Sequence, residues 1–71
     1  MERGAISRVQ LDRGYGRLVR LQFGGAEISF NAEDLVGCSF DQLRVGYPVD
    51  FELSVDLRRG PRARYVRVVE E

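Results

Sequence analysis

Apolar and polar residues alternate along five short segments of this chain, and the alternation predicts its secondary structure. The most regular segment is residues 49–55, where Val49, Phe51, Leu53 and Val55 alternate with polar residues. A period of two is typical of a β-strand that buries one face. Residues 5–11, 15–23, 27–31 and 62–69 show the same pattern less regularly. We therefore expect five strands.

The segments between these strands have the composition of turns. Gly24-Gly25 is a hairpin signal, and Asp12-Arg13-Gly14 and Arg58-Arg59-Gly60-Pro61 also favour turns. Residues 32–48 have no strong period and are expected to form a long loop, with one helical turn at residues 32–35. Short strands joined by glycine turns predict an all-β fold, a small five-stranded antiparallel Greek-key β-barrel of the OB-fold type.

The chain of 71 residues is expected to form a single domain over residues 1–71. Ile6 is predicted to point inward and Arg8 outward on the first strand. All four apolar residues of the segment 49–55 are predicted to point inward. The predicted barrel core consists of Ile6, Leu18, Ile28, Phe30, Val49, Phe51, Leu53 and Val66.

Composition excludes several classes of function. A domain of this size has no room for a deep enzyme pocket beside a full core, and the chain has no histidine, the commonest proton shuttle and zinc ligand. It has one cysteine, no signal-like apolar stretch at Met1–Gly4, and no apolar run near the roughly 20 residues that cross a bilayer. We expect a cytoplasmic protein with no membrane partner.

Two other candidate sites are interpreted as having no catalytic or metal-binding role. Asp50 and Glu52 share one face of a predicted strand, but no partner converges on them, and they are interpreted as a solvated face. Cys38 lies in the predicted loop without a nearby base, which argues against a nucleophile. We therefore expect a protein that is not an enzyme, with no catalytic residues, metal or cofactor.

The formal net charge is zero, but charge is unevenly distributed along the chain. Residues 1–26 carry five arginines against two acids, residues 27–56 seven acids against one arginine, and residues 57–71 five arginines against two acids. If the two ends lie together in the fold, the molecule has a basic face and an acidic face. All eleven basic residues are arginine, which stacks on flat groups and binds phosphate through a fork of donors.

One segment, Arg13-Gly14-Tyr15-Gly16-Arg17-Leu18, places an aromatic residue between two glycines. An aromatic side chain in such a position on an outward face has little to pack against, which favours contact with a ligand. The segment resembles the first nucleic-acid-binding motif of the cold-shock domain, usually Lys-Gly-Phe-Gly-Phe-Ile. Ile28–Asn31 stands at the position of that family's second motif, Val-Phe-Val-His, from which it differs. Segments similar to the family follow at Leu35–Phe40, Leu43–Gly46, Val49–Glu52 and Arg59–Ala63.

This resemblance covers the whole chain and implies a cold-shock-like barrel with an outward ligand face. Arg8 and Arg17 stand where the family has flat rings, and Ser29 and Asn31 replace the aromatic residue and the histidine of its second motif. Such changes favour binding by charge over binding by stacking. The residues that the resemblance places in contact with nucleic acid are Arg8, Arg13, Tyr15, Arg17, Ser29, Asn31 and Phe40, with Arg62 and Arg64 as backbone contacts.

The function implied by this resemblance is weak, salt-dependent binding of single-stranded RNA or DNA without catalysis. The role would be that of an RNA chaperone or a regulator of transcription or translation. The alternative is a protein-interaction module that kept the barrel and lost nucleic-acid binding. Its partner would be a charged protein or a second copy of the chain, forming a homodimer.

Overall fold

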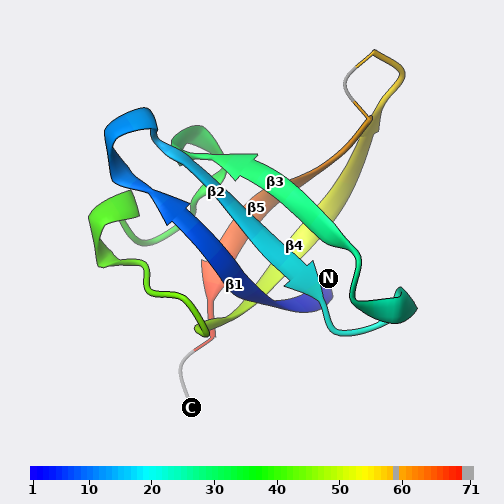
Figure 1. Cartoon of the computed structure of the whole chain (residues 1–71), viewed down its shortest axis with the longest axis horizontal. Helices are drawn as coiled ribbons and strands as arrows, with labels where there is room; N and C mark the ends of the chain where they lie inside the picture. Colours follow the sequence, from blue (N-terminus) through cyan, green and yellow to red (C-terminus); the bar gives the residue numbers. More distant parts are fainter. Residues whose placement is uncertain (59, 70–71) are drawn as a thin grey trace.

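A computed structural model describes residues 1–58 and 60–69, which form a closed barrel of five β-strands (Figure 1). Neighbouring strands follow the order β1-β2-β3-β5-β4, and pairing of β1 with β4 closes the barrel. The predicted five-stranded barrel is thus confirmed. The strands are β1 (Glu2–Gln10), β2 (Tyr15–Arg20), β3 (Glu27–Asn31), β4 (Pro48–Asp56) and β5 (Gly60–Val68).

The sheet is mixed, so the prediction of a wholly antiparallel barrel is wrong. Four neighbouring pairs are antiparallel, but β3 and β5 pair in parallel at Ser29 and Arg62. The strand count is the reason. Around a closed ring of five strands direction cannot alternate at every step, so at least one pair must run the same way.

Short 3₁₀ turns fill the connections between the strands. The turns η1 (Leu11–Arg13), η2 (Phe23–Gly25) and η3 (Ala32–Asp34) lie where turns or a helical turn were predicted, while η4 (Phe40–Gln42) was not predicted. The turn predicted at residues 58–61 includes Arg59, which lies outside the described residues. Among the described residues, no helix has the length and apolar character needed to span a membrane.

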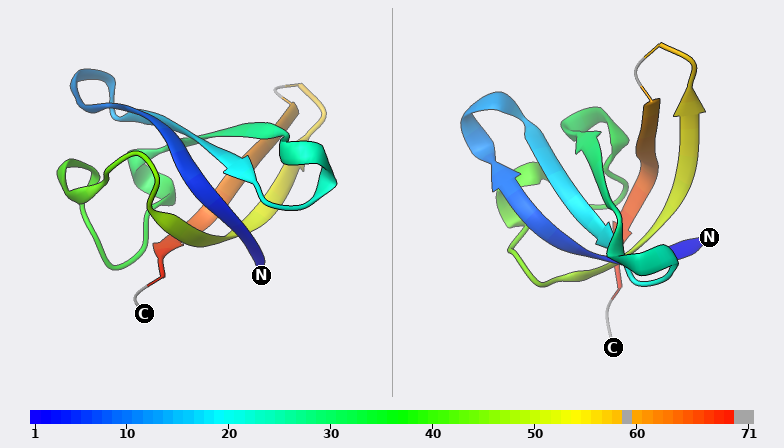
Figure 2. Two further views of the ribbon diagram at one scale, coloured as in Figure 1. Left: turned by 60° about the horizontal axis from the view of Figure 1, so that its bottom comes forward. Right: turned by 45° about the vertical axis from the view of Figure 1, so that its right-hand side comes forward.

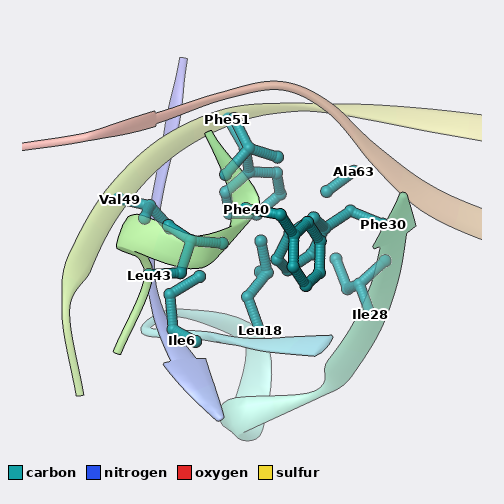
Figure 3. Close-up of a cluster of buried hydrophobic side chains, with 10 residues drawn as sticks. Ile6, Leu18, Ile28, Phe30, Phe40, Leu43, Val49, Phe51 and Ala63 are labelled. Carbon is teal, nitrogen blue, oxygen red and sulfur yellow. The ribbon is translucent and has the colours of Figure 1, made fainter. Parts of the chain in front are cut away.

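The barrel interior holds the predicted core with additions from the loop before β4 and from β5 (Figure 3). Seven of the eight predicted core residues are buried, and Leu53 is partly buried against them. The structure adds Phe40, Leu43 and Ala63. Val55, predicted to point inward, is 69% exposed. The reason is visible in Figures 1 and 2: the β4–β5 hairpin extends past the barrel, so its alternation continues where no core remains to cover it.

An ion pair lies at one end of the barrel. Arg20 is two residues from the buried Leu18, and Glu2 is two residues from the buried Gly4, so both side chains lean to the inner side. The Arg20 guanidinium donates through Nη2 to Glu2 Oε1 at 2.7 Å and through Nε to the other carboxylate oxygen. Hydrogen bonding to Glu2 raises the pKa of Arg20. The pair therefore joins the start of β1 to the end of β2.

Candidate functional site

Strand register sets two rows of polar side chains across the outside of the barrel. Arg8, Arg17 and Ser29 are successive partners on β1, β2 and β3, and Arg62 on β5 continues the row; we call these four residues the arginine row. A second row lies two residues away from the first on each of these three strands. In it, Gln10 on β1 pairs with Tyr15 on β2, and Tyr15 pairs with Asn31 on β3. We call these three residues the tyrosine row. The two rows form one outer face.

A β-bulge at Ser7 makes Arg8 part of this face. Ile6 pairs with Leu18, but Arg8 pairs with Arg17, so one extra residue is inserted on β1. Residues two apart on a regular strand share a face, and without the bulge Arg8 would point inward like Ile6. The structure therefore confirms that Ile6 points inward and Arg8 outward. The bulge between them explains how two residues two positions apart can face opposite sides of the strand.

The glycines beside Tyr15 are required by the fold. Gly14 adopts the left-handed conformation, with φ of 59°, at the end of η1. Gly16 is buried, and a Cβ placed there would lie 2.7 Å from Cζ of Phe30. Tyr15 itself is half-buried, and its hydroxyl oxygen accepts a hydrogen bond from Arg17 Nε at 3.0 Å. Backbone conformation thus explains Gly14, and packing explains Gly16, without a ligand.

Arg17 is held by a carboxylate on the next strand. Its Nη1 donates to Glu27 Oε1 at 2.6 Å, and the hydroxyl of Ser7 donates to Glu27 Oε2 at 3.0 Å. The hydrogen bond with Tyr15 and the negative charge of Glu27 raise the pKa of Arg17. Arg17 therefore remains a cation whose charge is balanced within the protein.

Arg62 is also held by a carboxylate. Its Nη2 lies 2.9 and 2.8 Å from the two carboxylate oxygens of Asp34, which is buried. Asp34 also accepts a hydrogen bond from the backbone N–H of Asn31 at 2.9 Å. The contact between Arg62 and Asp34 fastens η3 to β5, so Arg62 is part of the scaffold beside the face.

Arg8 and Arg13 are the exposed cations of this region. Among residues 1–58 and 60–69, neither makes an ion pair or a side-chain hydrogen bond with the protein. Arg64 is exposed as well, and it borders a hollow beside η3 whose lining also includes Glu33, Asp34 and Arg62 of the arginine row. Its guanidinium carbon lies 5.4 Å from the ring centre of Tyr65. The outer face therefore has two uncompensated positive charges at its edge.

Phe40, expected on the ligand face, lies in the core. It is 9% exposed, and its ring centre is 5.8 Å from that of Phe30 (Figure 3). The turn η4 begins at Phe40 and is followed directly by Leu43, and both side chains are buried in the core. This spacing of two apolar residues in an otherwise aperiodic loop was the sequence signal for η4. Tyr15 is the aromatic residue that remains on the outer face.

Charge is balanced between strands instead of gathered on two faces. The basic strands β1 and β2 are separated from the basic β5 by β3 on one side and β4 on the other, and both of these carry acids. Arg3 accordingly pairs with Asp50 at 2.8 Å, across β1 and β4. The condition for a basic and an acidic face, adjacency of the two chain ends, is not met by the barrel.

The other candidate residues lie apart from the outer face. Cys38 is half-buried and packs against the core. Asp50 is paired with Arg3, and Glu52 is exposed opposite Arg64. Within the described part of the chain, no three His, Cys, Asp or Glu residues are grouped so that they could hold a metal ion. A scan against known protein-family models and a search of the curated proteins both find no match to this chain.

Proposed function

We propose that the outer face binds single-stranded RNA or DNA without catalysis. The observation that carries this proposal is the register of the two rows: an aromatic ring lies between two carboxamides, Gln10 and Asn31, and arginines occupy the parallel row. Rings of this kind stack on bases, carboxamides hydrogen-bond to base edges, and guanidinium groups bind phosphates.

The distance between the rows suits one nucleotide. Two residues along a strand span about 7 Å, so a base over Tyr15 can have its phosphate near Arg8 or Arg17. Arg13, on the turn before Tyr15, can contact the next phosphate along the strand. Ser29 and Asn31 would offer polar contacts on β3, while Arg62 would support the face through its contact with Asp34.

Binding by this face is weak and depends on salt. Base stacking is worth about 1–3 kcal/mol per base, and one aromatic residue supplies it here. The remaining affinity comes from phosphate contacts, whose loss with salt follows the number of phosphates neutralised. We assign the barrel to the Greek-key OB type and to the cold-shock-like barrels within it. Its proposed role is that of a cytoplasmic RNA chaperone or a regulator of transcription or translation.

A protein-interaction module is the second candidate, and one observation favours it. Carboxylates from Glu27 and Asp34 balance two of the three arginines in the arginine row, which lowers the attraction for a polyanion. A surface of mixed charge suits a protein partner or a second copy of the chain.

Titration with a labelled single-stranded oligonucleotide at two salt concentrations tests the proposal. Tyr15→Ala is expected to weaken binding by about 1–3 kcal/mol, with the salt slope nearly unchanged, since it removes a stacking surface and no charge. Tyr47→Ala is the control, because Tyr47 is an exposed tyrosine that lies in the loop before β4, away from the two rows. If the wild type binds no oligonucleotide at low salt, the interaction module replaces this proposal.

A further inference from the structure

The carboxylate of Glu27 binds the guanidinium group of Arg17 on the outer face. Glu27 is the first residue of β3 and points outward, since the next residue, Ile28, is buried. One carboxylate oxygen accepts from Arg17 Nη1 at 2.6 Å and the other from Ser7 Oγ at 3.0 Å. Carboxylates and phosphates use the same guanidinium donors. The protein thus supplies its own anion to the arginine row.

This contact can be exchanged for a ligand. The side chains of Arg17 and Glu27 are 40% and 42% exposed, and an ion pair with such access to water contributes little to stability. The pair of Arg62 and Asp34 is different, since the Asp34 side chain is 6% exposed and both of its oxygens lie against Arg62. Breaking a buried pair is costly. Of these two carboxylates, Glu27 is therefore the one that a phosphate can displace.

We propose that Glu27 is an intramolecular competitor for the phosphate site at Arg17 and thereby a determinant of which ligands the face accepts. The inference rests on the proposed function. A single-stranded nucleic acid displaces the carboxylate of Glu27, which turns toward solvent while Arg17 takes the phosphate. A ligand without a phosphate at this position leaves the pair of Arg17 and Glu27 in place. The face therefore prefers ligands with a phosphate backbone, and its affinity for them is low because Glu27 competes for Arg17.

The test compares Glu27→Gln with Asp50→Asn in the full chain, with a labelled single-stranded oligonucleotide as the probe. Each variant removes one carboxylate from an exposed ion pair, and the side chains of Arg3 and Asp50 are 47% and 35% exposed. Glu27→Gln is expected to tighten binding about two- to fivefold, the affinity equivalent of an exposed ion pair. It should also steepen the salt slope by about 0.7, one more phosphate. Asp50→Asn is expected to change neither beyond a small uniform effect.

A background variant identifies the cation involved. In Arg17→Ala, the gain from Glu27→Gln should fall to that of Asp50→Asn, because the cation that Glu27 blocks is gone. Thermal unfolding checks that each variant folds, and Glu27→Ala replaces Glu27→Gln if the glutamine variant does not fold. Equal gains from Glu27→Gln and Asp50→Asn, or no gain from Glu27→Gln, would overturn the inference while the wild type still binds. Absence of binding in the wild type and in every variant would instead overturn the proposed function.

Discussion

Several residues on the outer face are needed for the fold itself, although the sequence suggests that they serve ligand binding. The glycines beside Tyr15 were part of the resemblance to a nucleic-acid motif, yet Gly14 is required by its positive φ and Gly16 by the ring of Phe30. Sequence alone could indicate that Tyr15 faces outward, because Tyr15 shares one side of the alternating pattern with Arg17 while Leu18 lies on the opposite side. It could not indicate that Arg17 is paired, because Glu27 lies ten positions away and meets it only through the register of β2 with β3.

Gly16→Ala should destabilise the barrel by about 1–3 kcal/mol, the usual cost of forcing extra volume into a packed interior. The added methyl group would meet Phe30 and would also lie 3.0 Å from the backbone oxygen of Arg8. Gly14→Asn serves as the comparison, since asparagine tolerates the left-handed conformation and no atom other than Ala32 Cβ is near. Urea unfolding measures both. Equal stability of Gly16→Ala and the wild type would mean that Phe30 moves aside freely.

At the scale of elements, strands were predictable and their ends and connections were less so. Alternation of apolar residues reports which face of a strand is covered, and the five strands were found for this reason. It does not report where the barrel stops, so Val55 continued the pattern into an uncovered hairpin. Alternation also does not detect a single 3₁₀ turn, which is too short to show a period. The turn η4 was therefore missed, together with the core residues Phe40 at its start and Leu43 directly after it.

Phe40→Ala is expected to lower the free energy of unfolding by about 3–5 kcal/mol, the range for removing a buried phenylalanine. The Phe40 ring packs against Phe30 inside the barrel, so the substitution should lower the stability of the protein even when no ligand is present. Leu57→Ala is the control, since Leu57 is fully exposed in the β4–β5 turn and should change stability by no more than about 0.5 kcal/mol. Chemical denaturation compares them. If the Phe40→Ala variant unfolds at the same denaturant concentration as the wild type, Phe40 is not a core residue.

For the whole molecule, strand order decides what the uneven charge along the chain can do. A sequence divided into basic, acidic and basic thirds suggests two charged faces, but the barrel places an acidic strand between basic ones on both sides. The charges then meet across strands as Arg3 with Asp50, Arg17 with Glu27, and Arg62 with Asp34. With a formal net charge of zero, long-range attraction of a polyanion is small. Any binding to nucleic acid must therefore depend on a few local cations.

This dependence predicts a difference between Arg8→Ala and Arg64→Ala. Both arginines are exposed and, among the described residues, form no ion pair, but Arg8 is a member of the arginine row on β1, while Arg64 lies on β5 opposite the acidic Glu52, two residues beyond the end of the row at Arg62. Arg8→Ala should lower the salt slope of single-strand binding by about 0.7, the contribution of one phosphate. Arg64→Ala should leave the slope nearly unchanged, although both variants change the net charge by the same amount. Titrations over a series of salt concentrations measure the two slopes. If both fall equally, binding follows net charge, and the outer face defined by Tyr15 and its neighbours has no special part in it.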